Sequence, residues 1–409
     1  MKTHSLLVAP LLALAASTAL AQTDPIKILF VGNSYTFGRA DPVMSYNAAN
    51  VHDLTAAFYA ADPSGANAFE PHPWGGVPGI FKEMTDEAGL NYDVSISARN
   101  AATLRGQFLD TASSAWKLRE NVASQNWGVV VLQEQSDAAL PAGMGKNANL
   151  AQTTAYANQF EKFIHNGAAQ SYTETQLYGS LAACEATGLS AGSCGTKRNI
   201  AANPNANPNT KVYLTDTWAR PDMVYPHLNI TDSTNTPDGA PVPDGSGTYA
   251  TLYYNALQGM TTDLHNSFAA IAAANPGFAG VIPVGDAFQA AFNAGLVQTS
   301  GFYDANGVYV PQSATGPFDL WWEDGLHASK YGSYLDALVQ FGTITGLNPL
   351  SLGANEKAAN DLGIDSNTAL MLEDVAAYQL GFAAAVPEPS TWALLAGGMG
   401  FIAWRRRRV

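Results

Sequence analysis

The chain has 409 residues, of which 47% are hydrophobic and only 13% are charged. This composition can bury a large core and excludes a disordered chain, and the two cysteines are too few for a small disulfide scaffold. The formal net charge of −14 argues against the basic surface that nucleic-acid binding requires. We therefore expect a globular protein without a nucleic-acid partner.

The first 21 residues have the pattern of a cleaved secretory signal. Lys2 is followed by an apolar stretch that ends in Ala19-Leu20-Ala21, and polar residues begin at Gln22. A buried first helix is the alternative, but Pro10 interrupts the apolar stretch. We predict a signal peptide over residues 1–21 and export of the chain.

The body of the chain alternates strand and helix patterns. Helical patterns lie between short apolar runs that are typical of strands buried on both faces, and the runs cover residues 26–32, 92–98, 127–133, 211–217 and 278–284. The alternation predicts an α/β domain over residues 24–350, with a central parallel sheet of five strands between two helical layers, as in flavodoxin-like folds. Polar insertions interrupt it at 41–73, 199–209 and 232–247, and residues 351–385 are expected to form a helical extension.

The last residues combine a short motif, an apolar segment and a basic cluster. Val386-Pro387-Glu388-Pro389 precedes the apolar stretch 391–404, whose 14 residues are fewer than the ~20 that span a bilayer comfortably. Four arginines, Arg405–Arg408, would hold its end in the cytoplasm. A plain tail anchor is the alternative interpretation.

This tail, residues 386–409, resembles the PEP-CTERM sorting signal of Gram-negative bacteria. The resemblance implies export across the inner membrane, recognition by a membrane-embedded exosortase, and transient membrane contact through the C-terminal segment. It also implies a final location at the cell surface or in the extracellular matrix.

Export makes a disulfide between Cys184 and Cys194 plausible, because they share one segment and are the chain's two cysteines. The histidine and cysteine spacing around them does not indicate a metal site. We predict that they close a loop.

Chemistry in an open parallel sheet gathers beyond the carboxyl ends of its strands. Gly32 allows a tight exit from the first strand, which places Ser34 on the loop that follows. Such a serine can attack an acyl carbon if a base reaches its hydroxyl, although a lone serine after a strand is more often a turn or cap residue.

His327 is the histidine best placed to be that base. Asp324 lies three residues before it, where its carboxylate can hold the Nδ1–H and leave Nε2 free. The alternative is a surface histidine near a helix cap. The other histidines of the body lack a carboxylate at this spacing, although Asp222 lies near His227.

The segments GNSYT at 32–36 and DGLH at 324–327 together resemble the SGNH (GDSL-type) hydrolase superfamily. One branch of that superfamily is marked by GNS in its first motif and LQEQS in a later one. Its further motifs occur in this chain in the same order: LQEQS at 132–136, Thr217-Trp218, PVGDA at 283–287 and Gly332-x-Tyr334. The resemblance implies that Ser34 is the nucleophile, His327 the general base and Asp324 the group that orients the imidazole.

The resemblance also implies an oxyanion hole. Its donors would be the Ser34 N–H and one residue from each of the superfamily's second and third conserved motifs, which correspond to Asn100 and Gln133 here. Two residues depart from the family pattern: Asn100 stands where a glycine is expected, and Gln133 where an asparagine is usual. Gly106 and Gln135 are the alternative donors.

The segment 188–192 matches the G-x-S-x-G pattern of a nucleophile elbow, with Ser190 at its centre. That elbow must connect a buried strand to a helix. Ser190 instead lies between two cysteines after a segment without β-branched residues, so we do not favour it as the nucleophile.

These features predict an exported serine esterase that needs no metal or cofactor and hydrolyses acyl esters. The expected substrate is an O-acetyl group on a carbohydrate or polysaccharide, with Trp218 and Trp322 as substrate-binding rings. The alternative for these two rings is packing in the core. A non-catalytic surface or matrix protein and an O-acyltransferase with the same serine are the alternatives.

Overall fold

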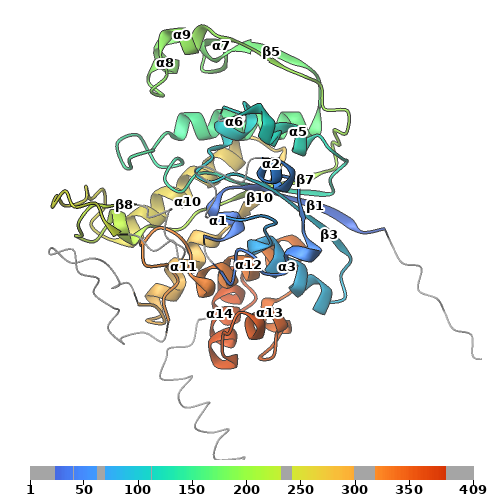
Figure 1. The fold of residues 1–409 in the computed structure, drawn as a ribbon, viewed down its shortest axis with the longest axis vertical. Helices are drawn as coiled ribbons and strands as arrows, with labels where there is room; N and C mark the ends of the chain where they lie inside the picture. Colours follow the sequence, from blue (N-terminus) through green and yellow to red (C-terminus); the bar gives the residue numbers. More distant parts are fainter. Residues whose placement is uncertain are drawn as a thin grey trace, which may run out of the picture.

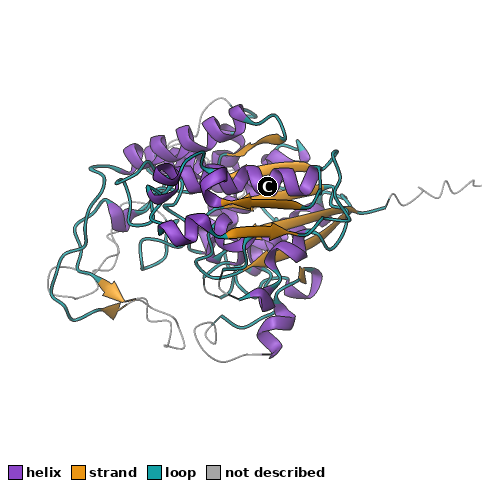
Figure 2. Ribbon diagram, turned by 90° about the horizontal axis from the view of Figure 1, so that it is seen from above, coloured by secondary structure: helices purple, strands orange, loops and turns teal. Residues whose placement is uncertain are grey.

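The computed structural model describes residues 24–39, 41–61, 70–111, 113–231, 242–298 and 318–383. Their centre is a six-stranded sheet with helices on both faces (Figures 1 and 2). The predicted signal peptide (1–21) and sorting tail (386–409) lie outside the described residues.

The central sheet is parallel throughout. Its strand order is β10-β7-β4-β1-β3-β2. Without the short edge strand β2, this is the flavodoxin-like order, in which the chain reverses direction across the sheet between β1 and β4. The bounds are β1 Ile26–Gly32, β2 His52–Asp53, β3 Tyr92–Ala98, β4 Val129–Gln133, β7 Lys211–Thr215 and β10 Phe278–Ile282.

The sequence predicted five strands, and this number is wrong by one. The additional strand, β2, pairs with β3 through His52↔Ser95 and Asp53↔Ile96. It lies within the segment expected to be a polar insertion. A two-residue strand is too short to produce an alternating or apolar pattern, so sequence periodicity could not reveal it.

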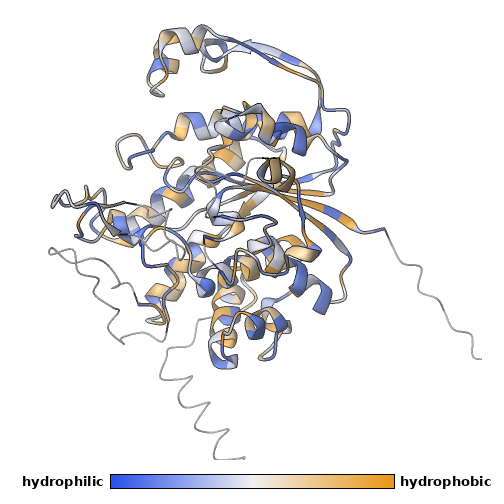
Figure 3. Ribbon diagram, in the orientation of Figure 1, coloured by the Kyte–Doolittle hydropathy of each residue, from blue (hydrophilic) through white to orange (hydrophobic). Residues whose placement is uncertain are grey.

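The central strands β1, β3 and β4 form because they are largely apolar, contain several β-branched residues and are covered on both sides. Every residue of β4 is buried, and Figure 3 shows hydrophobic residues along the central strands. Helices α6 (Leu150–His165) and α10 (Leu257–Ala274) lie on one face, and α3 (Gly76–Glu87) and α12 (Lys330–Thr345) lie on the other (Figure 1).

Shorter helices connect these elements or extend the layers. Helices α13 and α14 follow the main domain, and α14 packs against α12. The bounds are α1 Ser34–Phe37, α2 Ala56–Ala61, α4 Leu104–Phe108, α5 Leu118–Val122, α11 Val284–Asn293, α13 Lys357–Asp361 and α14 Ser366–Gln379.

The two cysteines lie in an excursion from the main body, at the top of Figure 1. Its base is the antiparallel pair β5 (Gln170–Thr173) and β6 (Lys197–Ile200). Cys184 and Cys194 form a disulfide with an S–S distance of 2.02 Å. It joins the short helices α8 and α9 where the sequence suggested a loop. The three helices of the excursion have the bounds α7 Glu174–Leu177, α8 Leu181–Glu185 and α9 Ala191–Gly195.

A second antiparallel pair is formed by β8 (Ile230–Thr231) and β9 (Val242–Pro243). In the described ranges, no helix combines the length and the apolar character needed to cross a membrane. The C-terminal segment expected to contact the membrane lies outside these ranges.

Candidate active site

Ser34 lies immediately beyond the carboxyl end of β1, next to the point where the strand order reverses. Asn33 is extended and caps α1, because its side chain accepts a hydrogen bond from the Tyr35 N–H (3.1 Å). A Cβ on Gly32 would lie 1.9 Å from the Thr36 Oγ1, so a side chain cannot be accommodated at this turn. The strand end and the cap together fix the position of Ser34.

Ser34, His327 and Asp324 form one chain of hydrogen bonds. The Ser34 Oγ lies 2.9 Å from the His327 Nε2, and the His327 Nδ1 lies 2.5 Å from the Asp324 Oδ2. All three residues are buried. The structure thus brings together a serine and a histidine that are 293 positions apart in the sequence.

The Asp324 carboxylate is fixed by its own loop. Its Oδ1 accepts hydrogen bonds from the main-chain N–H groups of Leu326 and His327, both at 2.9 Å. Burial raises the pKa of Asp324, but the charge and hydrogen bonds of His327 outweigh burial and leave this pKa below its usual value. The ionised carboxylate can therefore hold the imidazole with Nε2 directed at the serine.

Two aromatic side chains hold the Asp324–His327 loop by hydrogen bonds to its main chain. The Tyr35 hydroxyl and the Trp218 Nε1–H both donate to the Leu326 carbonyl oxygen, at 2.9 and 3.0 Å. Their rings are stacked with centroids 3.9 Å apart, and Phe288 stacks on the other side of Trp218 at 4.8 Å.

This arrangement corrects the expectation that Trp218 contacts substrate. Trp218 is 1% exposed, so its ring positions the loop and does not line a binding surface. The sequence showed an aromatic residue near a motif, but whether such a ring faces solvent or its neighbours depends on packing. Trp322 is half-buried, with its ring centroid 6.5 Å from that of His327, and stays a candidate for substrate contact.

Gln133 does not have the surroundings expected of an oxyanion donor. Its Oε1 accepts hydrogen bonds from the Asn33 N–H (3.1 Å) and the Thr36 hydroxyl (3.0 Å). Its Nε2 donates to the Glu134 carbonyl oxygen. The Gln133 amide therefore braces the turn that carries Ser34, which corrects the role expected from sequence.

Asn100 lies in the turn after β3, next to the turn that carries Ser34. Gly32 and Ala98 are in register at the ends of β1 and β3, so Ser34 and Asn100 each lie two residues beyond that pair. The alternative donors are already engaged: the Gly106 N–H donates to the Thr103 hydroxyl and the Gln135 amide to the Ser136 hydroxyl.

Glu134 is a buried acid beside the site that the sequence analysis did not single out. Its carboxylate accepts hydrogen bonds from the main-chain N–H groups of Leu104 (2.9 Å) and Gln135 (2.7 Å) and from the Thr153 hydroxyl (3.1 Å). Burial outweighs these donors and raises the pKa of Glu134 to about 7. Its position inside the LQEQS segment was the available signal.

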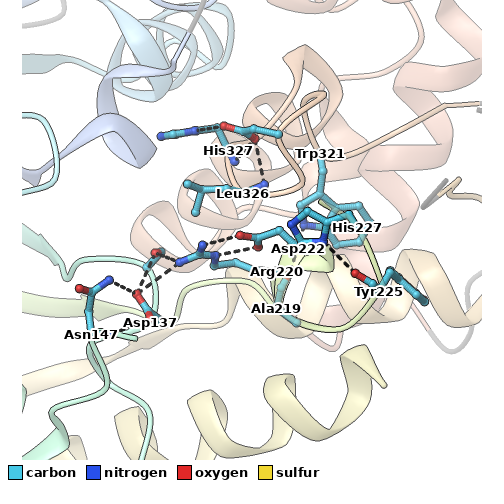
Figure 4. Close-up of polar contacts among 12 residues, drawn as sticks. Asp137, Asn147, Ala219, Arg220, Asp222, Tyr225, His227, Trp321, Leu326 and His327 are labelled. Carbon is cyan, nitrogen blue, oxygen red and sulfur yellow. Dashed lines mark hydrogen bonds and ion pairs between the residues drawn. The ribbon is translucent and has the colours of Figure 1, made fainter. Parts of the chain in front are cut away.

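A cavity of about 320 Å³ reaches the site at Asp324 and Leu326. Arg220 lies within it and is held by Asp222 (3.0 and 2.6 Å) and Asp137 (3.3 Å), as Figure 4 shows. The lining is mostly polar, and its remaining residues are Lys146, Asn147, Met223, His227, Asn229, Ala250, Thr251 and Tyr253. Such a lining offers several hydrogen-bonding groups close to the Asp324–His327 loop.

Ser190 does not belong to this arrangement. It caps helix α9 in the cysteine-containing excursion, where its hydroxyl lies 3.0 Å from that of Ser193. Ser190 is exposed and follows no strand, so it lacks the setting of a nucleophile elbow.

Comparison with known proteins identifies the tail of the chain. Residues 385–408 match the model of the PEP-CTERM protein-sorting motif, which confirms the interpretation of this segment and indicates export with membrane-associated sorting. No curated protein matches the chain.

Two solved structures resemble the chain weakly. A DUF4886 family protein from Bacteroides uniformis has 13% identity and a TM-score of 0.44, with 89% of this chain and 98% of that chain covered. A candidate SGNH hydrolase from Slackia heliotrinireducens has 17% identity and a TM-score of 0.34, with 78% and 100% covered. Both TM-scores are low, and the fold is assigned from the strand order of this chain.

Proposed function

We propose that this protein is an exported serine hydrolase that cleaves acyl esters, with O-acetyl groups on a carbohydrate as its substrate class. The observation that carries the proposal is the hydrogen-bonded chain from Ser34 through His327 to Asp324, with distances of 2.9 and 2.5 Å. A surface protein that has lost activity would not need to keep these three side chains in line.

The reaction uses the three residues in distinct roles. Ser34 attacks the acyl carbon while the His327 Nε2 accepts the serine proton. Asp324 stabilises the imidazolium, which then gives its proton to the leaving alcohol. Water attacks the resulting acyl-enzyme with His327 again as the base, and this releases the acid and restores Ser34.

The oxyanion would be held by main-chain N–H groups at the two adjacent turns, those of Ser34 and Asn100. This assignment keeps two of the three expected donors and leaves Gln133 as a bracing residue. Removal of one oxyanion donor typically lowers kcat by about 100–1000-fold, so the turn geometry at Asn100 is a sensitive part of the proposal.

The polar cavity beside Asp324 supports a hydroxylated substrate over a long acyl chain. Pockets for apolar ligands are lined mainly by hydrophobic side chains, whereas this one presents an arginine, acids, amides and a histidine. Trp322 beside His327 supplies a ring on which a sugar can stack. The sorting motif supports export, which is consistent with a polysaccharide substrate outside the cytoplasm.

The test is hydrolysis of p-nitrophenyl acetate and of an acetylated polysaccharide by the purified protein. We expect turnover that falls by about 10⁴-fold or more in Ser34→Ala and is retained in Ser190→Ala, the matched control. Turnover that does not depend on Ser34 would overturn the proposal, and absence of turnover on both substrates would favour a non-catalytic role. Transfer of the acetyl group to an added sugar in place of water would identify an O-acyltransferase.

A further inference from the structure

A second group of ionisable side chains gathers beyond the carboxyl end of β7. Asp216 is the residue after that strand, His265 belongs to α10 and Asp286 to the first turn of α11. One ligand atom from each of the three lies within 4.8 Å of the others. The His265 Nδ1 and the Asp286 Oδ2 are 2.7 Å apart.

Asp216 is an unusual member of this group because its carboxylate is buried and unpaired. The residue is 0% exposed, and among the described residues neither carboxylate oxygen has a hydrogen-bond partner. The Gly285 N–H nearby donates instead to the main-chain oxygen of Asp216, at 3.3 Å. An ionised carboxylate in such surroundings is costly unless a proton or a cation compensates it.

The local backbone is shaped around this carboxylate. A Cβ on Gly285 would lie 2.5 Å from the Asp216 Oδ1 and 2.2 Å from the Thr217 carbonyl oxygen, so the start of α11 approaches closely only because Gly285 has no side chain. Burial, followed by the charge of Asp286, raises the pKa of Asp216 well above its usual range.

We infer that Asp216, His265 and Asp286 bind a divalent transition-metal cation, for which zinc is the natural probe. An imidazole nitrogen with carboxylate oxygens is a ligand set that zinc accepts. His265 would exchange its contact with Asp286 for a bond to the cation. The His265 side chain is 52% exposed, so the cation can enter from solvent and keep a water ligand.

The cation would tie together the elements that support the candidate active site. It bridges the end of β7 to α10 and α11. Trp218 lies two residues beyond Asp216, and Phe288, its stacking partner, lies two residues beyond Asp286. The expected effect of binding is therefore stabilisation of the folded state by mass action, independent of the ester chemistry.

The experiment measures zinc binding by calorimetry and thermal unfolding, on untagged, chelator-treated full-length protein. We expect saturation near one zinc per chain and a Tm that rises with zinc. His265→Ala, a change at an exposed position, should weaken zinc binding by at least about tenfold, and Asp286→Asn should do the same. His52→Ala is the matched control, because His52 is also exposed and lies 3.0 Å from the carboxylate of Asp93.

Equal zinc binding by all variants would overturn the inference, as would no saturable binding by the unmodified protein. A site that binds calcium in preference to zinc and is unaffected by His265→Ala would also overturn it, because the imidazole would then not be a ligand. Since the readouts are zinc stoichiometry and Tm, they are separate from the Ser34-dependent hydrolysis that tests the proposed function.

Discussion

Two buried aspartate–histidine pairs in this protein have almost the same geometry. The Asp324 Oδ2 lies 2.5 Å from the His327 Nδ1, and the Asp53 Oδ2 lies 2.6 Å from the His72 Nδ1. In both pairs, contact with the histidine offsets burial and leaves the pKa of the aspartate below its usual value.

The pairs differ at the other ring nitrogen. The Nε2 of His327 meets the Ser34 hydroxyl, whereas within the described residues the buried Nε2 of His72 has no hydrogen-bond partner. The His72 ring is stacked on Trp74, with centroids 3.6 Å apart. An aspartate that orients a histidine therefore occurs both with and without a serine partner, and the strand end that presents Ser34 distinguishes the two pairs.

The largest expected difference between the pairs is in activity. Asp324→Asn should lower kcat for p-nitrophenyl acetate by roughly 10³–10⁴-fold, because an amide favours the wrong imidazole tautomer and cannot stabilise the imidazolium. The matched change Asp53→Asn should leave kcat nearly unaltered. Both are measured at a temperature where circular dichroism shows folded protein, and similar losses in the two variants would remove the distinction.

Loss of the histidine should reduce stability more in the Asp53–His72 pair than in the Asp324–His327 pair, which is the reverse of the order expected for activity. His72→Ala removes a ring packed between aromatic side chains and leaves the Asp53 carboxylate, 1% exposed, without its partner. We expect the free energy of unfolding to fall by about 3–5 kcal/mol. The loss in His327→Ala should be smaller, because Asp324 borders the cavity and water can reach it. Urea unfolding of both variants gives the comparison, and a larger loss in His327→Ala would contradict it.

The smallest expected effect is on the pH dependence of stability, and it comes from Glu134, a buried acid that contacts no histidine among the described residues. Its pKa is raised to about 7 from an ordinary 4.5, so the folded state binds its proton more tightly than the unfolded state does. The resulting stabilisation is complete below pH 4.5 and is lost as the pH rises through about 7, with a span of about 3 kcal/mol.

Glu134→Gln should therefore flatten the fall in stability between pH 5 and pH 8. The unmodified protein and the variant are compared by thermal unfolding across this range. Parallel pH profiles would show that Glu134 does not titrate as expected. Asp53 and Asp324, whose folded pKa values are lowered, act in the reverse sense and lose their stabilisation only as the pH falls through those values.

The sequence predicted the main strands well, because continuous apolar, β-branched runs are a strong local signal. β1 and β3 have the predicted bounds, and β4, β7 and β10 lie within their predicted runs. Helix α11 was missed because its start, Val284, continues an apolar run. The pair β5 and β6 was missed because its residues are largely polar and Ile200 alone among them is buried.

The roles of individual site residues were harder to predict than their positions. Gln133 and Trp218 both lie at strand ends near Ser34, as expected, but Gln133 faces the Asn33 N–H and Trp218 faces Tyr35. Side-chain direction at a strand end depends on neighbours from other strands. No pattern in one segment reports those neighbours.

By itself, the sequence determined the alternation of strands and helices, the sorting tail and the three-residue spacing of Asp324 and His327, because each of these is a local property. Only the tertiary structure decided which histidine meets a serine. Other histidines in the described part of the chain also contact a carboxylate: His52 contacts Asp93, His72 contacts Asp53, His165 contacts Glu161 and His265 contacts Asp286. A hydrogen bond requires atoms about 3 Å apart, and for residues 293 positions apart only the packing of the Asp324–His327 loop against the turn after β1 can set that distance.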